Sequence, residues 1–426
     1  MKHRIFLISS FTFLISHFSF LICNAMTVQV QTDRPWYLAG EAMTIRVTAD
    51  DALIAYAELC DTRGLAAGVV VGLNGGVGEK AMELPADLHS GYYVLSVYTS
   101  GDANVSQRIV AVVNPLRSSA DDDIEWVKGD SCWAEETHPR PLPQQGGNGG
   151  GSVRETEGHI IRARVWNVYN GHTYGISEIT PSLSIVGKQI HYFEGNMVND
   201  STAVFFTYGI HGKHPLVLSA LTSADESLPI ELISPFVTLL PEQLPHLVFH
   251  YQRSEVEARS LDMQRHQRAI TPAKREVKLG DRADETAEDG VPLDYDGTLF
   301  GTKPDLSYNL DEYRQFLTVR EVLIEYVQCV TRMKDRGMTR LYVRREQDQY
   351  NNALPTLVLI DGMPVLDAER LLNYDARRIH YINIYGDQYS FGKGVYNGIL
   401  SFVTRSGRLT NYPTEPNAQY LVYEFP

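Results

Sequence analysis

The stretch LPTLVLIDGMPVLD, residues 354–367, carries the clearest local fold signal in the chain. A short apolar run, 357–360, stops at Asp361-Gly362, and a second apolar run follows. An Asp-Gly pair between apolar runs is typical of a two-residue hairpin turn, because Gly adopts positive φ cheaply and an Asp carboxylate bonds the turn's own amides. We therefore predict a hairpin in which Asp361 is a turn residue. The alternative, a catalytic acid, would need a second carboxylate or a His placed beside it, and the sequence offers none.

The residues around this hairpin predict a small α+β domain over 306–408, followed by a tail over 409–426. In FLTVREVLIEYVQCV, residues 316–330, apolar residues recur at the spacing of one buried helix face. Thr318 and Glu321 form a capping box at its start, and Gly337 is expected to end the helical region. Strands are expected in LYVRR, LPTLVLIDG, IHYINIYG and YNGILSFVTRSG.

This order of elements resembles the plug domain of TonB-dependent receptors. The matching residues are Ile360, Asp361, Gly362, Pro364, Leu371, Leu372, Ile379, Ile382, Ile384, Tyr389, Phe391, Gly392, Asn397, Gly398, Ile399, Leu400, Phe402 and Thr404. In a transporter the plug is followed by a long series of barrel strands, whereas few residues follow Gly407 here. The resemblance therefore implies a plug-like domain without a barrel.

Residues 26–114 read as short alternating strands separated by Gly, Pro and Asp turns, the pattern of an antiparallel β-sandwich. Within it, TDRPWYLAGE, residues 32–41, resembles the D-[KR]-P-x-Y-x-x-G-E turn of the macroglobulin MG2 domain. Arg34, Pro35, Tyr37, Gly40 and Glu41 fit that turn, and Leu84-Pro85 and Ser90-Gly91-Tyr92-Tyr93 fit the end of the same domain. The chain lacks the Gly-Cys-Gly-Glu-Gln thioester sequence, which excludes covalent trapping of proteases by that route.

The middle of the chain is divided by two polar segments. Residues 115–157 are acidic and then rich in Pro and Gly, which predicts a linker. Residues 158–250 are rich in strand-forming runs and predict a second sandwich, whose first strand GHIIRARV resembles that of the carboxypeptidase regulatory-like family. Residues 251–305 carry too few apolar residues for a core and predict a connector that begins as a helix. The expected fold is thus multidomain and mainly β: two antiparallel β-sandwiches followed by a small α+β plug-like domain.

Composition and the N-terminus predict an exported protein that does not bind nucleic acid. The formal net charge is -14, and an acidic surface repels phosphate. Residues 1–25 have Lys2 and Arg4, a long apolar stretch and small residues at the end, which predicts a secretory signal peptide. Lipidation of Cys23 is the less favoured alternative, because Ile22 precedes it where lipoprotein processing needs a small residue. Beyond the signal, Cys60, Cys132 and Cys329 are sparse and odd in number, so no disulfide framework is expected.

Three segments resemble chemical sites but lack residues that such sites need. GLNGGVGEK, residues 72–80, lacks the Gly-Lys-Ser/Thr of a phosphate loop and predicts a glycine-rich hairpin. The run 121–123 of three Asp lacks the rest of a calcium loop and is read as a solvated charge run. His211 and His214 lack a third metal ligand and are placed in a loop. No hydrolase motif such as G-x-S-x-G or H-E-x-x-H occurs. We therefore expect no catalytic residue, no metal and no cofactor.

The resemblances together imply a cell-envelope protein of Gram-negative bacteria of the Bacteroidetes type. We expect a non-catalytic binding or scaffold protein in the periplasm or at the outer membrane, peripheral rather than membrane-spanning. Its partner would be an envelope protein, such as an outer-membrane barrel or a TonB system component, bound by strand addition at a sandwich edge. The candidate partner-binding residues are Trp36, Asp387, Tyr389, Phe391 and Lys393. The alternatives are a macroglobulin-like non-covalent protease inhibitor and an unrecognised hydrolase.

Overall fold

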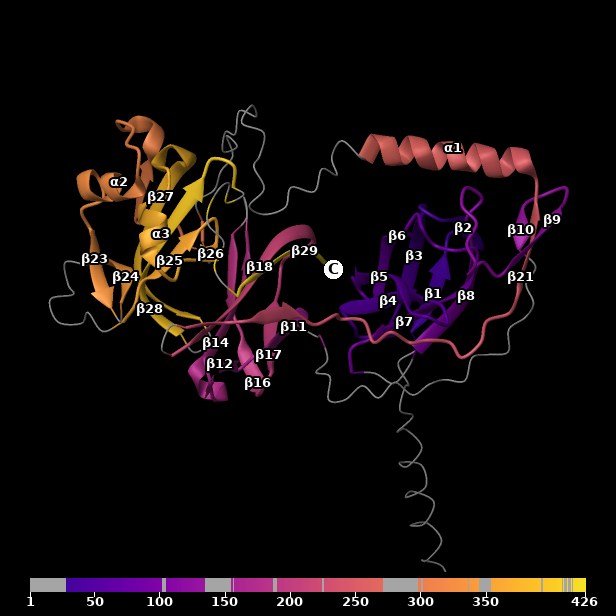
Figure 1. Cartoon of the computed structure of the whole chain (residues 1–426), viewed down its shortest axis with the longest axis horizontal. Coiled ribbons are helices and arrows are strands. Elements are labelled where there is room, and N and C mark those ends of the chain that lie inside the picture. Colours follow the sequence, from indigo (N-terminus) through magenta and orange to yellow (C-terminus); the bar gives the residue numbers. More distant parts are fainter. Residues whose placement is uncertain are drawn as a thin grey trace, which may run out of the picture. The chain divides into compact units, whose positions relative to one another are not determined.

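The computed structural model describes residues 28–101, 105–134, 155, 157–186, 190–223, 226–270, 298–299, 302–335, 337–344, 354–391, 394–407, 409, 412, 415 and 417–426. Strands dominate these residues, which confirms the prediction of a mainly β chain (Figure 1). The chain divides into two compact units: Met1–Thr156 with Thr238–Val256, and Glu157–Val237 with Glu257–Pro426. The predicted signal peptide and the candidate lipidation site lie outside the described residues.

The first unit contains two sheets that share one hydrophobic core. One sheet has the order β1 (Gln29–Thr32), β3 (Ala42–Thr48), β6 (Val77–Glu83). The other has the order β2 (Trp36–Leu38), β8 (Val105–Val113), β7 (Gly91–Thr99), β4 (Ile54–Cys60), β5 (Leu65–Gly72). Alternating residues such as Ile45 and Val47 from the first sheet and Leu59 and Leu95 from the second meet in this core. The pairing is antiparallel throughout, except that β2 runs parallel to β8.

The turn at residues 32–41 is held by its own side chains, which explains the residue types in the motif. The Tyr37 hydroxyl donates to Asp33 Oδ1 at 2.5 Å, and the Arg34 N–H donates to Tyr37 Oη at 3.0 Å. Glu41 Oε2 accepts from the Leu38 N–H at 2.7 Å, and Gly40 has φ 89, which a side chain would strain. The polar groups of the motif are therefore used to fix the backbone.

A third sheet in the first unit corrects the linker expected over 115–157. The strands β9 (Ile124–Lys128) and β10 (Trp133–Ala134) flank β21 (Leu247–Tyr251), in the order β10-β21-β9. Trp126 packs edge-on against Phe249 and Tyr251, with ring centroids 5.6 and 5.3 Å apart. The acidic composition of this segment did not predict strands. The strands form because they pair with the apolar strand β21, which lies about 120 residues further along the sequence. The same pairing removes β21 from the second sandwich predicted over 158–250.

The second unit begins with another pair of sheets around one core. One sheet has the order β16 (Asn196–Asn199), β17 (Thr202–Thr207), β11 (His159–Val165), β20 (Ile230–Leu232). The other has the order β15 (His191–Glu194), β14 (Ile179–Ile185), β18 (Gly212–Thr222), β19 (Ser227–Leu228), and a small hairpin joins β12 (Val168–Tyr169) to β13 (His172–Thr173). Residues of both sheets, among them Ile161, Phe205 and Leu218, are buried together.

The segment 409–426, expected to be a tail, contributes a strand to this block. Strand β29 (Gln419–Phe425) pairs antiparallel with β18 over seven residues. Tyr423 and Phe425 are buried in the block's core, and the Tyr423 hydroxyl lies 2.7 Å from His159 Nε2. The final residues therefore close the core of a block that begins some 260 residues earlier in the sequence.

The C-terminal block of the second unit is a mixed sheet with short helices (Figure 1). Its strand order is β22 (Leu306–Asn309), β27 (Ile379–Phe391), β28 (Gly394–Thr404), β25 (Leu357–Ile360), β26 (Met363–Pro364), with β25 parallel to β28. Helices α2 (Val319–Glu325) and α3 (Ala368–Leu372) and the hairpin of β23 (Val330–Asp335) and β24 (Met338–Val343) accompany it. The capping box of Thr318 and Glu321 is present as predicted. Helix α2 is shorter than expected, and Gly337 belongs to the β23–β24 turn with φ 85.

The predicted connector begins as the helix α1 (Arg253–Ile270), as its sequence indicates, and most of 271–305 lies outside the described residues. Among the helices of the described segments, none combines the length and the apolar character needed to cross a membrane.

Candidate functional site

The predicted hairpin at Asp361 is present, but its carboxylate does a different task from the one expected. β25 and β26 pair antiparallel around Asp361 and Gly362, whose φ values are 46 and 90. The Asp361 side chain is fully buried. It accepts hydrogen bonds from the Thr404 N–H at 2.7 Å, the Thr404 hydroxyl at 2.5 Å and the Leu409 N–H at 3.1 Å. The expectation that it bonds the turn's own amides is therefore replaced by bonds to the end of β28 and the segment after it.

Burial raises the pKa of Asp361 to about 6, against the opposing effect of these hydrogen bonds from Thr404 and Leu409. A carboxyl group in this state could act as an acid only if a substrate reached it. Its oxygens instead face backbone and hydroxyl donors of the same block, with no solvent exposure. Asp361 therefore has a structural role: its carboxylate links the β25–β26 turn to the end of β28 and to Leu409.

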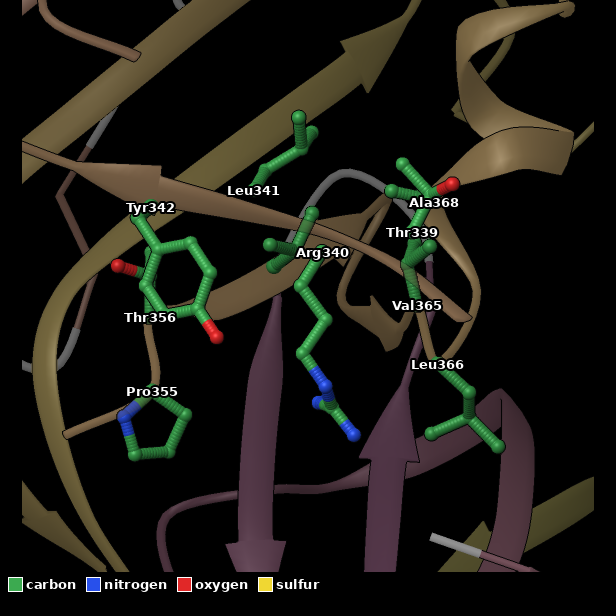
Figure 2. Close-up of a pocket in the computed structure, with 10 residues that line it drawn as sticks. Thr339, Arg340, Leu341, Tyr342, Pro355, Thr356, Val365, Leu366 and Ala368 are labelled. Carbon is green, nitrogen blue, oxygen red and sulfur yellow. The ribbon is translucent and has the colours of Figure 1, made fainter. Parts of the chain in front are cut away.

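A small hollow lies in the C-terminal block between β24, the start of β25 and the segment before α3 (Figure 2). Its lining residues are Thr339, Arg340, Leu341, Tyr342, Pro355, Thr356, Val358, Val365, Leu366 and Ala368. The volume of about 20 Å³ is room for about one water molecule. The lining contains one guanidinium and three hydroxyl groups, but no carboxylate, imidazole or thiol.

A cluster of charged residues in the first unit ties the segment after β8 to the sheets. Arg63 contacts Asp61 at 2.7 Å and Asp121 at 2.7 Å. Asp122 accepts from the Ser90 N–H at 2.6 Å. Burial and then the Arg63 charge lower the pKa of His89, which keeps its imidazole neutral near pH 7. Asp121 and Asp123 remain exposed, as expected for a solvated charge run, although Asp121 also pairs with Arg63 and Asp123 contacts His246.

The other sites set aside from the sequence have local structural explanations. At 72–80, Asn74 bridges Val77 across Gly75 and Gly76, which both have positive φ, so the glycine-rich hairpin is present. His211 precedes β18, whereas His214 lies within that strand and not in the expected loop. His214 Nε2 lies 2.9 Å from the His211 carbonyl oxygen. No group of three or more candidate metal ligands is found among the residues that the structure describes.

The predicted partner-binding residues differ in their exposure. Trp36 is buried and packs edge-on against Phe249, with ring centroids 5.0 Å apart. Asp387 is exposed, whereas Tyr389 is half-buried against a cluster that includes the buried Tyr192. The backbone of Phe391 pairs with Gly394 at the end of the β27–β28 hairpin. Lys393 lies outside the described residues.

A feature that no sequence motif indicated is the edge strand β5, with the sequence LAAGVVVG. It is the outermost strand of its sheet, beyond β4, and the longest edge strand in the described part of the chain. It contains no charged residue and no proline. Edge strands usually carry such residues, because they prevent pairing with other chains. The signal was present as an uncharged eight-residue run, but the sequence alone does not show that the strand lies at an edge.

Comparison with known proteins gives no family assignment. No protein-family model and no curated protein matches the chain. Among solved structures, it is similar to a biofilm associated protein BSP domain, with 10% identity, a TM-score of 0.18, and coverage of 53% of this chain and 30% of that one. An Escherichia coli alpha-2-macroglobulin activated by porcine elastase gives 9% identity, a TM-score of 0.20, and coverage of 51% and 20%. A Salmonella alpha-2-macroglobulin mutant gives 10% identity, a TM-score of 0.19, and coverage of 51% of this chain and 15% of that one. The matched region is less than a third of each of these chains, and TM-scores this low support no argument about fold or activity.

Proposed function

We propose that this is an exported, non-catalytic binding or scaffold protein of the cell envelope, which holds a protein partner by strand addition at the edge of β5. The single observation that carries the proposal is the uncharged, proline-free edge of this strand. A strand at a sheet edge presents a row of backbone donors and acceptors, and an extended peptide that pairs with them gains main-chain hydrogen bonds.

The neighbouring strand β6 shows what a protected edge looks like in the same unit. β6 lies at the edge of the other sheet and carries Glu79, Lys80 and Glu83. β5, in contrast, consists of Leu, Ala, Gly and Val residues only. Its residues Ala67, Val69 and Val71 point into the shared core. An added strand would set its inward side chains beside these three residues. We therefore propose a partner segment in which apolar residues alternate with variable ones.

The envelope location and a partner such as an outer-membrane barrel or a TonB system component belong to the same proposal. They are supported by the signal-like N-terminus and by the plug-like residue pattern around Asp361, both of which are features of the sequence. The rival role of non-covalent protease inhibitor is supported by the MG2-like turn, which the structure shows as a bonded unit around Tyr37.

A charge placed on the edge tests the binding proposal. Ala66→Lys adds a charged side chain to β5, and Thr48→Lys adds the same group to an exposed position of β3, which is flanked by strands on both sides. Affinity capture from envelope fractions, read by mass spectrometry, should give a partner that the first variant loses and the second keeps. If both variants capture the same proteins, strand addition at β5 is rejected.

Two activity assays separate the rival roles. Inhibition of a panel of secreted endoproteases by the purified protein, at stoichiometric amounts, would favour the inhibitor over the scaffold. Turnover of generic ester, peptide or glycoside substrates would favour the hydrolase. We expect neither activity.

A further inference from the structure

A second surface, in the C-terminal block, has the composition of a protein-binding site. Three aromatic rings lie together beside helix α2: Tyr313 and Tyr326 have centroids 4.6 Å apart, and Phe316 and Tyr326 have centroids 5.5 Å apart. All three side chains are half-buried and border a shallow hollow. Leu317, next in sequence, is 66% exposed.

Three arginines border the same hollow, and they differ in how their charges are matched. Arg377 donates to both carboxylate oxygens of Asp375, at 2.9 and 2.8 Å. Arg405 is held by Asp311 at 2.5 Å. Arg314 is exposed, and the described residues give its guanidinium no ion pair. The hollow therefore has one guanidinium whose donors remain available to a partner.

We propose that this surface, called here the aromatic–arginine hollow, binds a protein segment that presents an apolar side chain next to a carboxylate. Its residues are Leu310, Tyr313, Arg314, Gln315, Phe316, Val322, Tyr326, Ala376, Arg377 and Arg405. Tyr and Arg are the residue types that dominate binding energy at protein interfaces, and aromatic rings supply contact area at little entropic cost. A carboxylate on the partner complements the guanidinium of Arg314 and can bond it through two parallel N–H groups.

The size of the hollow restricts what it accepts. The hollow is a shallow depression of about 10 Å³, room for about one water molecule at most. Pockets for whole small molecules start at roughly 300 Å³, so this surface does not enclose a free metabolite. A partner's apolar side chain would instead lie across the half-buried rings of Tyr313, Phe316 and Tyr326, with its carboxylate beside Arg314. The site belongs to the second unit and does not depend on strand addition at β5 in the first.

The experiment uses a phage-displayed library of random 12-residue peptides, selected on the full chain. Selected peptides are then synthesised, and their affinities are measured by isothermal titration against the wild type and four variants. Arg314→Glu and Phe316→Ala alter the hollow. Arg332→Glu reverses an exposed charge on β23, and Ile324→Ser removes an apolar side chain that is 68% exposed, on the side of α2 away from Val322.

We expect selected peptides to share an aromatic or aliphatic residue next to Asp or Glu. Arg314→Glu should weaken their binding at least about tenfold, which corresponds to about 1.4 kcal/mol, and the two control variants should change it less than about twofold. Protection of Arg314 from phenylglyoxal by a bound peptide provides a second readout that requires no substitution. The proposal is overturned if no binder is selected, if binders lack the acidic residue, or if Arg314→Glu binds them as the wild type does.

Discussion

Replacement of Asp361 by Asn should remove a pH dependence from the stability of the C-terminal block. Asn keeps the shape of the side chain and tolerates the positive φ of 46 at this position. It removes the charge that burial opposes. Burial raises the pKa of Asp361 from 3.8 to about 6, so the folded state binds a proton more tightly than the unfolded state does. The extra stability of the wild type is therefore present at low pH and is lost as pH rises through about 6.

The size of the effect follows from these two pKa values. For a folded pKa of about 6 and an unfolded value of 3.8, the wild type should lose about 1.4 kcal/mol between pH 5 and pH 7.5. That is a factor of about ten in the equilibrium for opening the block. The full difference between the two pKa values corresponds to about 3 kcal/mol. Because all other titrating groups are common to both proteins, their effects cancel in the difference between wild type and Asp361→Asn.

Hydrogen exchange measured by mass spectrometry suits a chain of several blocks, for which a single unfolding free energy is not defined. The informative peptides contain the amides of Thr404 and Leu409, which donate to the Asp361 carboxylate. After correction for intrinsic exchange, protection in the wild type should fall relative to the variant as pH rises from 5 to 7.5. Asp387→Asn, at an exposed position of the same block, is the matched control and should keep the wild-type profile. A difference between wild type and Asp361→Asn that stays constant over this pH range would show that Asp361 does not titrate with a raised pKa in the folded block.

Three further substitutions, one of them with a matched control, test other parts of the structure. Glu58→Ala removes the buried carboxylate that accepts from the Thr238 N–H at 3.0 Å and also from the Leu239 N–H. The free energy of local opening around Thr238 and Leu239, measured by hydrogen exchange, should therefore fall by about 2–4 kcal/mol. Unchanged protection of these amides would contradict a role of Glu58 in holding this segment. Phe425→Ala removes a fully buried side chain, and should lower the free energy of unfolding of the second unit, measured by urea denaturation, by about 3–5 kcal/mol. The control Val422→Ala, at a position 56% exposed, should lower it by less than about 0.5 kcal/mol. Tyr37→Phe deletes the hydroxyl bonded to Asp33 and should cost about 1 kcal/mol in thermal unfolding of the first unit; no shift would mean that the bond is not needed for the turn.

Features with local causes could be predicted from the residues alone. The hairpin at Asp361-Gly362 and the turn at Gly75-Gly76 follow from residues that accept positive φ. The capping box of Thr318 and Glu321 follows from side chains that reach amides within the same helical turn. The excess of strands follows from alternating apolar runs. Each of these signals acts over a few residues, so a single sequence is enough to read it.

Contacts between segments far apart in the sequence could not be predicted and appear only in the folded chain. The carboxylate of Asp361 bonds residues 43 and 48 positions away, strand β21 joins β9 across more than a hundred residues, and β29 pairs with β18 across about two hundred. The same is true of the two proposed binding surfaces. Only strand order leaves β5 at an edge, and only packing brings Tyr326 against Tyr313 and Phe316, which lie beside Arg314 in the sequence. The physical reason is that backbone pairing and apolar burial are nearly indifferent to sequence separation. The choice among many compatible partners is made by the packed core as a whole.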